Sequence, residues 1–236
     1  MAMRPEIRAV LYDFDGTLAD STELILRCYR HTMTTHLGAA PPDEEWVRGF
    51  GMTLESQVLR FARSPAEAAA MVATYRDYQL EHHDGLLHAF PGARETVREL
   101  ARRGVRLAIV TSKHAGTALR GLELCGLDGY FAAVVTPEDV RHPKPHPEPV
   151  LHALRRLGAA PGEALFVGDS PHDVAAGRAA GVRTAAALWG PFPHSVLEAA
   201  GPDVLLHAQH EVLWLLDAQA AGADEEDALR RKVAAG

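Results

Sequence analysis

The chain has 236 residues, a length that suits one or two domains and can bury a core without disulfides or a structural metal. Its 24 Lys and Arg residues and 31 Asp and Glu residues give a net charge of −7, which argues against a general nucleic-acid binder. Two cysteines, Cys28 and Cys125, cannot form a disulfide framework, and no apolar run approaches the roughly 20 residues of a membrane span. We therefore expect a cytoplasmic protein with neither a nucleic-acid nor a membrane partner.

Short apolar segments alternate with helical patterns along most of the chain. The first predicted strand covers residues 7–12 and stops at two acids and a glycine. Further strands are predicted over residues 105–110, 132–135, 164–167, 183–188 and 204–206. Helices are predicted over residues 91–103, 114–124, 148–157 and 174–180. Such alternation is typical of βαβ units, so we predict an α/β fold with a doubly wound parallel sheet and helices on both faces.

Residues 20–86 interrupt this alternation. They contain helical patterns over residues 22–37, 54–63 and 65–79, and no convincing strand. We therefore predict a core formed by residues 1–19 and 87–217, with a small helical domain inserted at residues 20–86. The hinges of this insertion are expected near residues 19–21 and 84–89. The tail, residues 218–236, is rich in Ala and charge and is expected to be a frayed helix or disordered.

Polar residues follow the predicted strands at the point where each strand ends. In open parallel sheets, ligands bind beyond the carboxyl ends of the strands, so these residues should converge on one crevice. They are Asp13, Asp15, Thr111, Lys144, Asp169 and Asp173.

These residue types suit phosphoryl transfer. One carboxylate of the pair Asp13 and Asp15 can act as nucleophile, and the other as general acid and base. The backbone N–H groups of Gly16 and Thr17 can hold phosphate oxygens. Asp13, Asp15 and Asp169 can gather Mg²⁺, a hard ion that prefers oxygen ligands. Two further groups suit the phosphate: Lys144 as a point charge and Thr111 as a hydroxyl donor.

The motifs together resemble those of the haloacid dehalogenase superfamily. They are DFDGT (13–17), IVTS (109–112), Lys144 and GDSPHD (168–173), in that order. The resemblance covers nearly the whole chain and implies a Rossmann-like core with an inserted helical cap. It implies Asp13 as nucleophile and Asp15 as acid and base, with Mg²⁺ as cofactor. It also places Thr111, Ser112 and Lys144 at the phosphate, Asp169 at the metal, and Asp173 as a further acidic partner that ligates directly or through water.

Three features narrow the reaction within that superfamily. Dehalogenases lack a carboxylate at the position of Asp15, Thr17 is typical of phosphatases, and phosphonatases need a cap lysine that residues 19–86 do not contain. Residues 75–86 and 134–149 resemble the phosphoglycolate phosphatase-like group, and within it the PpaX-type pyrophosphatases. The resemblance implies hydrolysis of a small phosphorylated metabolite or pyrophosphate through an aspartyl phosphate, by a monomer or homodimer.

Two other functions stay open at this point: a sugar phosphomutase of the same superfamily, and a phosphoryl-accepting receiver protein. In the insertion, Arg48, Gly51 and Met52 are candidate substrate contacts. The histidine pairs 82–83 and 142/146 could suggest a zinc site, but no cysteine lies near them, and we interpret them as hinge and loop residues.

Overall fold

The computed structural model describes residues 6–220, and its centre is a six-stranded sheet in which all neighbouring strands are parallel. The strand order is β5-β4-β1-β6-β7-β8. The strands are β1 (Ala9–Tyr12), β4 (Arg106–Val110), β5 (Ala133–Val135), β6 (Ala164–Gly168), β7 (Arg183–Ala187) and β8 (Val204–Leu206). This topology confirms the predicted Rossmann-like α/β class, and every predicted strand is present with ends shifted by two residues at most.

Strand β1 is buried on both faces, as its continuous apolar sequence predicts. Because side chains alternate along a strand, Val10 and Tyr12 belong to one hydrophobic cluster, whereas Ala9 and Leu11 belong to the other. The central position of β1, between β4 and β6, brings the residues that follow it close to the ends of both neighbours.

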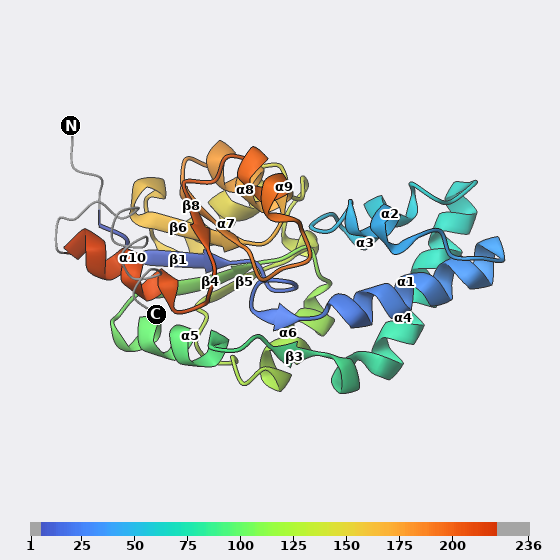
Figure 1. The fold of residues 1–236 in the computed structure, drawn as a ribbon, viewed down its shortest axis with the longest axis horizontal. Helices are drawn as coiled ribbons and strands as arrows, with labels where there is room; N and C mark the ends of the chain where they lie inside the picture. Colours follow the sequence, from blue (N-terminus) through green and yellow to red (C-terminus); the bar gives the residue numbers. More distant parts are fainter. Residues whose placement is uncertain (1–5, 221–236) are drawn as a thin grey trace.

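Helices cover both faces of the sheet. Helices α7 and α8 lie on one side, and α5, α6 and α10 lie on the other (Figure 1). Their bounds are α5 (Ala93–Arg102), α6 (Ala115–Leu124), α7 (Glu148–Leu157), α8 (Pro171–Ala179) and α10 (Glu211–Ala220), with the short α9 (His194–Ala199) before β8. No helix in residues 6–220 has the length and apolar character needed to cross a membrane. The sequence prediction missed α9 and α10, and the part of the predicted tail beyond residue 220 lies outside the described residues.

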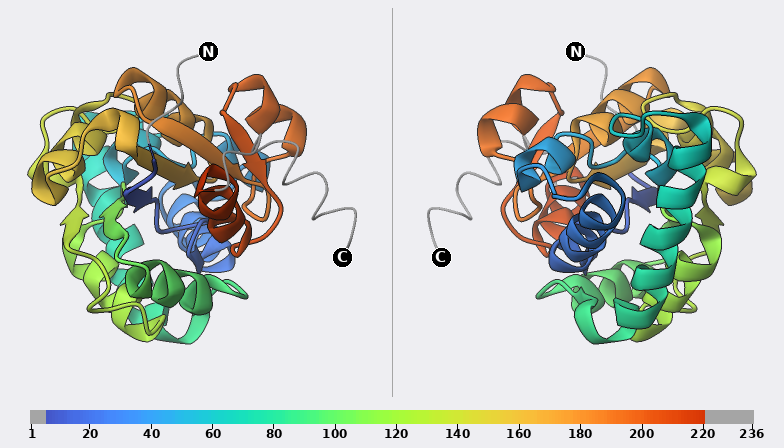
Figure 2. Two further views of the ribbon diagram at one scale, coloured as in Figure 1. Left: turned by 90° about the vertical axis from the view of Figure 1, so that its left-hand side faces the viewer. Right: turned by 90° about the vertical axis from the view of Figure 1, so that its right-hand side faces the viewer.

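Four helices extend beyond the carboxyl ends of the strands, and we call them together the cap. They are α1 (Thr22–Leu37), α2 (Asp43–Val47), α3 (Leu54–Val58) and α4 (Pro65–Leu86). The right-hand view of Figure 2 shows the long helices α1 and α4 in front of the sheet. At the base of the cap, the short strands β2 (Ala19–Asp20) and β3 (His88–Ala89) pair antiparallel. The two expected hinges are therefore hydrogen-bonded to each other.

Helix α4 continues seven residues past its predicted end, through the segment expected to be a hinge. Its buried side chains recur every four residues: Met71, Tyr75, Gln79 and His83. The last two are polar, so a search for apolar periodicity ends too early. The helix predicted over residues 54–63, in contrast, ends at Val58.

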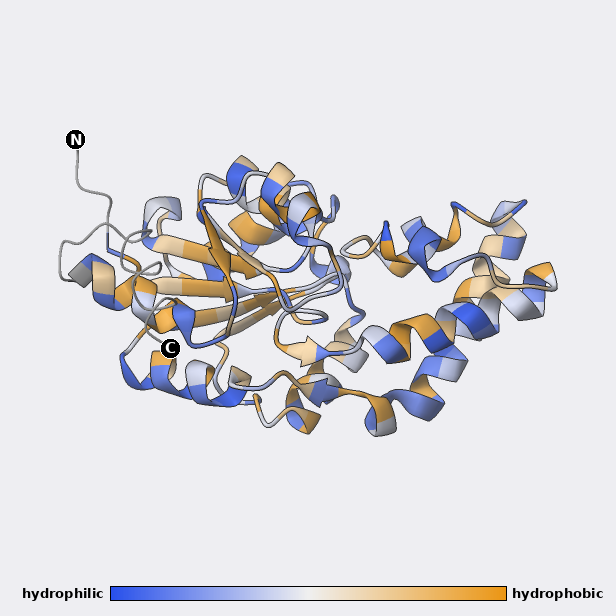
Figure 3. Ribbon diagram, viewed as in Figure 1, coloured by the Kyte–Doolittle hydropathy of each residue, from blue (hydrophilic) through white to orange (hydrophobic). Residues whose placement is uncertain are grey.

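The cap has an aromatic core of its own. The Tyr29 and Trp46 rings stack with their centroids 4.8 Å apart, and Tyr75 also stacks on Trp46, with the centroids 5.9 Å apart. Trp46 belongs to α2, which the sequence prediction missed because the helix has only five residues. Figure 3 shows the strands as largely hydrophobic, whereas α1 and α4 alternate between hydrophilic and hydrophobic residues. This pattern fits helices with one face on the core and one in water.

Candidate active site

A cavity of about 400 Å³ lies where the cap meets the carboxyl ends of β1, β4 and β6. Its floor is formed by residues that follow those strands: Asp13, Asp15, Gly16, Thr111, Ser112, Lys113 and Asp169. Its opposite wall comes from the cap and includes Ile25, Trp46, Phe50, Met52, Tyr75 and Arg76. The cap side also carries polar residues, among them Glu55, Gln57 and Gln79, so the cavity is polar on the sheet side and mixed on the cap side.

Lys144 is buried beneath the floor and joins two of the carboxylates. Its Nζ lies 3.1 Å from Asp13 Oδ2 and donates hydrogen bonds to Asp173 Oδ1 at 2.6 Å and to the carbonyl of Val110 at 3.2 Å. The second oxygen of Asp173 accepts a hydrogen bond from Ser170 Oγ at 2.5 Å, within the capping box that begins α8. Asp173 thus holds Lys144 against Asp13.

The turn after β1 holds the other buried carboxylate. Thr17 Oγ1 donates to Asp169 Oδ1 at 2.7 Å, while the Thr17 carbonyl accepts hydrogen bonds from Trp189 Nε1 and Gln209 Nε2. Gly16 has φ of +79°, and a Cβ there would lie 2.3 Å from Asp169 Oδ2. Glycine at this position is required by both the backbone conformation and the close approach of Asp169. Thr17 itself is fully buried and does not line the cavity.

Burial makes these carboxylates hard to ionise. Burial raises the pKa of Asp13 to about 7; Lys144 opposes this effect and Asp173 adds to it. Burial also raises the pKa of Asp169 well above its usual value, and the charges of Asp13 and Asp173 raise it further. For Lys144 burial alone would lower the pKa, but Asp13 and Asp173 outweigh burial and the pKa is raised. The single ammonium of Lys144 therefore faces more negative charge than it can balance.

This excess of buried negative charge fits a hard divalent cation. Carboxylate oxygens of Asp13, Asp169 and Asp173 all lie within 4.8 Å of one another. Oxygen ligands of this kind are those that Mg²⁺ prefers. The carboxylate of Asp15, which the sequence analysis assigned to the same ion, is not part of this group.

Asp15 is instead paired with Lys113, a residue that the sequence analysis did not single out. Lys113 Nζ lies 2.9 and 3.2 Å from the two oxygens of Asp15, and the Lys113 side chain is only 4% exposed. Asp13 and Asp15 therefore have separate lysine partners, although both line the cavity. Lys113 directly follows the IVTS segment, and its position beyond the end of β4 was the signal that could have revealed it.

The loop between α2 and α3 brings the cap into contact with the sheet side of the cavity. Ser112 Oγ donates to the Gly51 carbonyl at 2.7 Å, and a Cβ on Gly51 would lie 2.5 Å from Ser170 Oγ. Met52 lines the cavity, as does Gly51. Arg48 does not: its side chain is 67% exposed and bonded to Glu45. Of the three expected cap contacts, two reach the cavity and Arg48 does not.

The chain is similar to known hydrolases in sequence. The sequence profile of the haloacid dehalogenase-like hydrolases matches residues 10–187. A pyrophosphatase PpaX from Bacillus cereus (strain G9842) is 40% identical over 210 residues, which cover 89% of this chain and 96% of the relative.

Two solved structures are similar in fold. A predicted phosphoglycolate phosphatase from Haemophilus somnus superposes with a TM-score of 0.82, covering 89% of this chain and 97% of that one; at 21% identity this likeness concerns the fold alone. A protein from Bacteroides vulgatus, provisionally described as a β-phosphoglucomutase, has a TM-score of 0.79 and 27% identity, with 93% of this chain and 91% of that one covered.

Proposed function

This chain belongs to the haloacid dehalogenase-like hydrolases and is a phosphatase- or pyrophosphatase-like enzyme, and on that premise we propose that it hydrolyses a small phosphate substrate with Mg²⁺ as cofactor and Asp13 as nucleophile. One observation carries the proposal. Asp13 is held by Lys144 at the floor of a cavity, and a second carboxylate, Asp15, lines the same cavity from two residues further on.

In the first proposed step, a carboxylate oxygen of Asp13 attacks the phosphorus atom. The P–O bond to the leaving group breaks, and Asp15 donates its proton to the departing oxygen. Asp13 is then an acyl phosphate. Lys144 stays beside Asp13, held by Asp173, and keeps the reacting carboxylate oriented.

In the second step, water attacks the phosphorus atom of the acyl phosphate. Asp15 accepts a proton from this water, the P–O bond to Asp13 breaks, and inorganic phosphate leaves. Mg²⁺, held by Asp13 and Asp169 with Asp173 beside them, would neutralise the negative charge of the phosphoryl oxygens. Thr17 fixes the orientation of Asp169 for that purpose.

The shape of the cavity supports a small substrate. Its volume of about 400 Å³ lies at the lower end of the range for small-molecule sites, and the cap encloses it on the side opposite the sheet. On that side, Phe50, Met52 and Trp46 limit the access of water to the reacting phosphate, although polar residues such as Arg76 and Gln79 line it as well. We propose pyrophosphate as the first substrate to test, because a relative that is 40% identical carries that name. Phosphoglycolate is the second, because the sequence resembles the phosphoglycolate phosphatase-like group.

The test is phosphate release from a panel of small phosphate esters and pyrophosphate, measured with Mg²⁺ for the wild type and for Asp13→Asn. We expect turnover of at least one member of the panel and its loss in the variant. Turnover by the variant at more than a few per cent of the wild-type rate would refute the nucleophile. A wild type that is folded but inactive on the whole panel would refute the substrate class.

A sugar phosphomutase is the second candidate, because the Bacteroides vulgatus structure combines a TM-score of 0.79 with 27% identity. A mutase would convert a hexose 1-phosphate into the 6-phosphate, whereas a phosphatase would release inorganic phosphate. Product analysis by NMR distinguishes the two. The receiver alternative is disfavoured by the match to a hydrolase profile over residues 10–187.

A further inference from the structure

The loop that carries Lys144 also presents two imidazole rings to solvent. His142 and His146 flank Lys144 at equal distances in the sequence, yet their side chains are 65% and 50% exposed, whereas that of Lys144 is 1% exposed. The two rings lie 4.7 Å apart between centroids. The loop thus buries its lysine at the active site and exposes its histidines to solvent.

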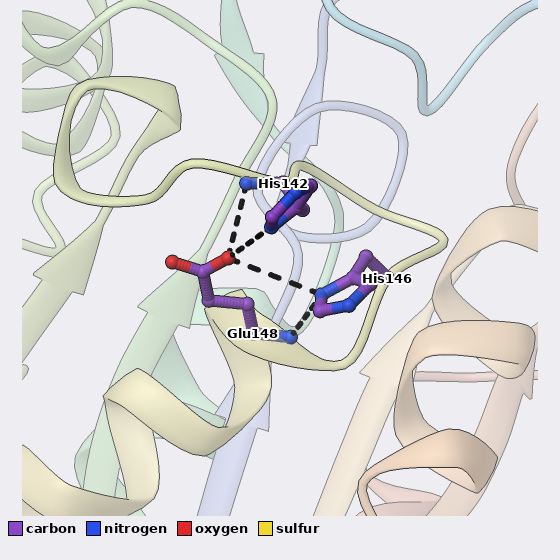
Figure 4. A group of neighbouring side chains, drawn as sticks. All are labelled: His142, His146 and Glu148. Carbon is purple, nitrogen blue, oxygen red and sulfur yellow. Dashed lines mark hydrogen bonds and ion pairs between the residues drawn. The ribbon is translucent and has the colours of Figure 1, made fainter.

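A carboxylate completes this outward group. Glu148 Oε2 lies 2.9 Å from His142 Nδ1 and 4.0 Å from His146 Nδ1, so it faces both rings (Figure 4). Glu148 supplies a third donor beside these histidines, which the sequence analysis interpreted as loop residues because no cysteine is near. We propose that His142, His146 and Glu148 bind a transition-metal dication of the Zn²⁺ or Ni²⁺ class, at a site separate from the magnesium site and independent of the reaction proposed above.

The geometry needs only small adjustments to hold such an ion. One ligand atom from each of the three residues lies within 4.8 Å of the others. A tetrahedral ion with bonds of about 2.0 to 2.1 Å requires ligand atoms about 3.3 Å apart. The 2.9 Å separation would widen and the 4.0 Å separation would shorten as the two exposed rings rotate. The ion would also replace the hydrogen bond that His146 Nδ1 accepts from the Glu148 backbone N–H at 3.1 Å. Water would supply the remaining ligand.

The carboxylate is fixed in place before any ion binds. The backbone N–H of Arg141 donates to Glu148 Oε1 at 3.0 Å, and that of His142 donates to Oε2 at 3.1 Å. Ligating carboxylates in metal sites are commonly held by such hydrogen bonds. These bonds lower the pKa of Glu148 to about 2, with the Arg141 N–H contributing most and His142 adding to it, so the carboxylate is charged at neutral pH.

The backbone between the two histidines is also restricted. Prolines occupy positions 143 and 145, a third follows at 147, and the N–H of His146 donates to the Pro143 carbonyl at 3.0 Å. Proline fixes φ near −65°, so the loop loses little conformational freedom when an ion joins its ends.

The donor set decides which ion binds here. Imidazole suits Zn²⁺, Cu²⁺ and Ni²⁺, whereas Mg²⁺ prefers carboxylates and waters. The buried carboxylates of the active site, in contrast, suit Mg²⁺ better than a transition metal. An excess of Mg²⁺ should therefore fill the active site and leave the histidine site to the transition metal.

Isothermal titration calorimetry with Zn²⁺, in excess Mg²⁺, tests the site. The wild type should bind one Zn²⁺ per chain. The double variant His142→Asn/His146→Asn should bind Zn²⁺ at least about tenfold more weakly, and Glu148→Gln should weaken Zn²⁺ binding by roughly 10- to 100-fold. The matched control, His31→Asn/His82→Asn, removes two histidines that stack on Tyr78 in the cap and should bind as the wild type does.

A second readout does not depend on heats of binding. Zn²⁺ should raise the melting temperature of the wild type and the control, and leave that of His142→Asn/His146→Asn unchanged, because only a ligand bound to the folded state stabilises it. Equal affinity in the double variant and the wild type, or no Zn²⁺ binding by the wild type, would overturn the proposal and leave the three residues as a hydrogen-bonded loop closure.

Discussion

Replacing Asp13 by Asn should stabilise the metal-free protein at alkaline pH while abolishing turnover. Burial raises the pKa of Asp13 from its usual value of 3.8 to about 7 in the folded chain. Between these two pH values the folded state binds a proton that the unfolded state does not bind. The free energy of unfolding therefore falls as pH rises from about 4 to about 7, and above that range the charged carboxylate is a constant penalty.

The size of the effect follows from that shift. A difference of about 3 pKa units corresponds to about 4 kcal/mol of destabilisation at pH 8. Asparagine removes this charge, but its amide cannot accept hydrogen bonds from both Phe14 N–H and Lys144, as the carboxylate does. One lost hydrogen bond costs roughly 1 to 3 kcal/mol. We therefore expect Asp13→Asn to gain about 1 to 3 kcal/mol at pH 8 and little or nothing at pH 5.

Urea unfolding in EDTA, at both pH values, measures this difference. Asp128→Asn, the same substitution at an exposed position, is the matched control. Adding Mg²⁺ at pH 8 should stabilise the wild type more than Asp13→Asn, because the variant has lost one carboxylate ligand. A variant that is less stable than the wild type at pH 8, or whose stability difference does not depend on pH, would refute the reasoning.

Three further predictions concern the reaction. Asp15→Asn should slow hydrolysis of alkyl phosphates by roughly 10²- to 10⁴-fold. It should slow hydrolysis of p-nitrophenyl phosphate less, because a good leaving group needs no proton. Equal losses of rate on both substrates would contradict the acid role of Asp15. EDTA should abolish turnover and Mg²⁺ restore it, with Ca²⁺ restoring it poorly because its coordination is larger and looser; full activity in Ca²⁺ or in chelator would exclude the metal assignment. Thr17→Val, which removes the hydroxyl that holds Asp169, should weaken Mg²⁺ activation by roughly 10- to 100-fold, and an unchanged Mg²⁺ dependence would show that the hydrogen bond has no such role.

The sheet could be predicted from the sequence because its strands are short, apolar and buried on both faces, and because glycines and acids mark their ends. The cap was harder. Its helix α4 is held by Gln79 and His83 as well as by apolar residues, and α2 is too short to show a period. Strands β2 and β3 have two residues each, so only their pairing in three dimensions reveals them.

The candidate site, like the fold, could be predicted from the sequence only in part. Chain order at strand ends predicts that Asp13, Thr111 and Asp169 meet, since parallel strands bring their carboxyl ends to one edge. It does not predict which lysine contacts which acid. Lys144 is bonded to Asp13 and Lys113 to Asp15, and both pairings depend on loop conformation rather than on spacing. Nor does the sequence show that the Arg48 side chain bonds to Glu45 of helix α2 and does not line the cavity.

The most direct test of the proposed mechanism is to locate the covalent intermediate. The enzyme is mixed with substrate and Mg²⁺, quenched rapidly, reduced with borohydride and digested for mass spectrometry. The account predicts reduction of an acyl phosphate at Asp13 alone. With p-nitrophenyl phosphate, whose leaving group needs no proton, Asp15→Asn should accumulate more of it because the second step lacks its base. A reduced residue other than Asp13, or no reduced residue under conditions where phosphate is released, would contradict the proposed mechanism.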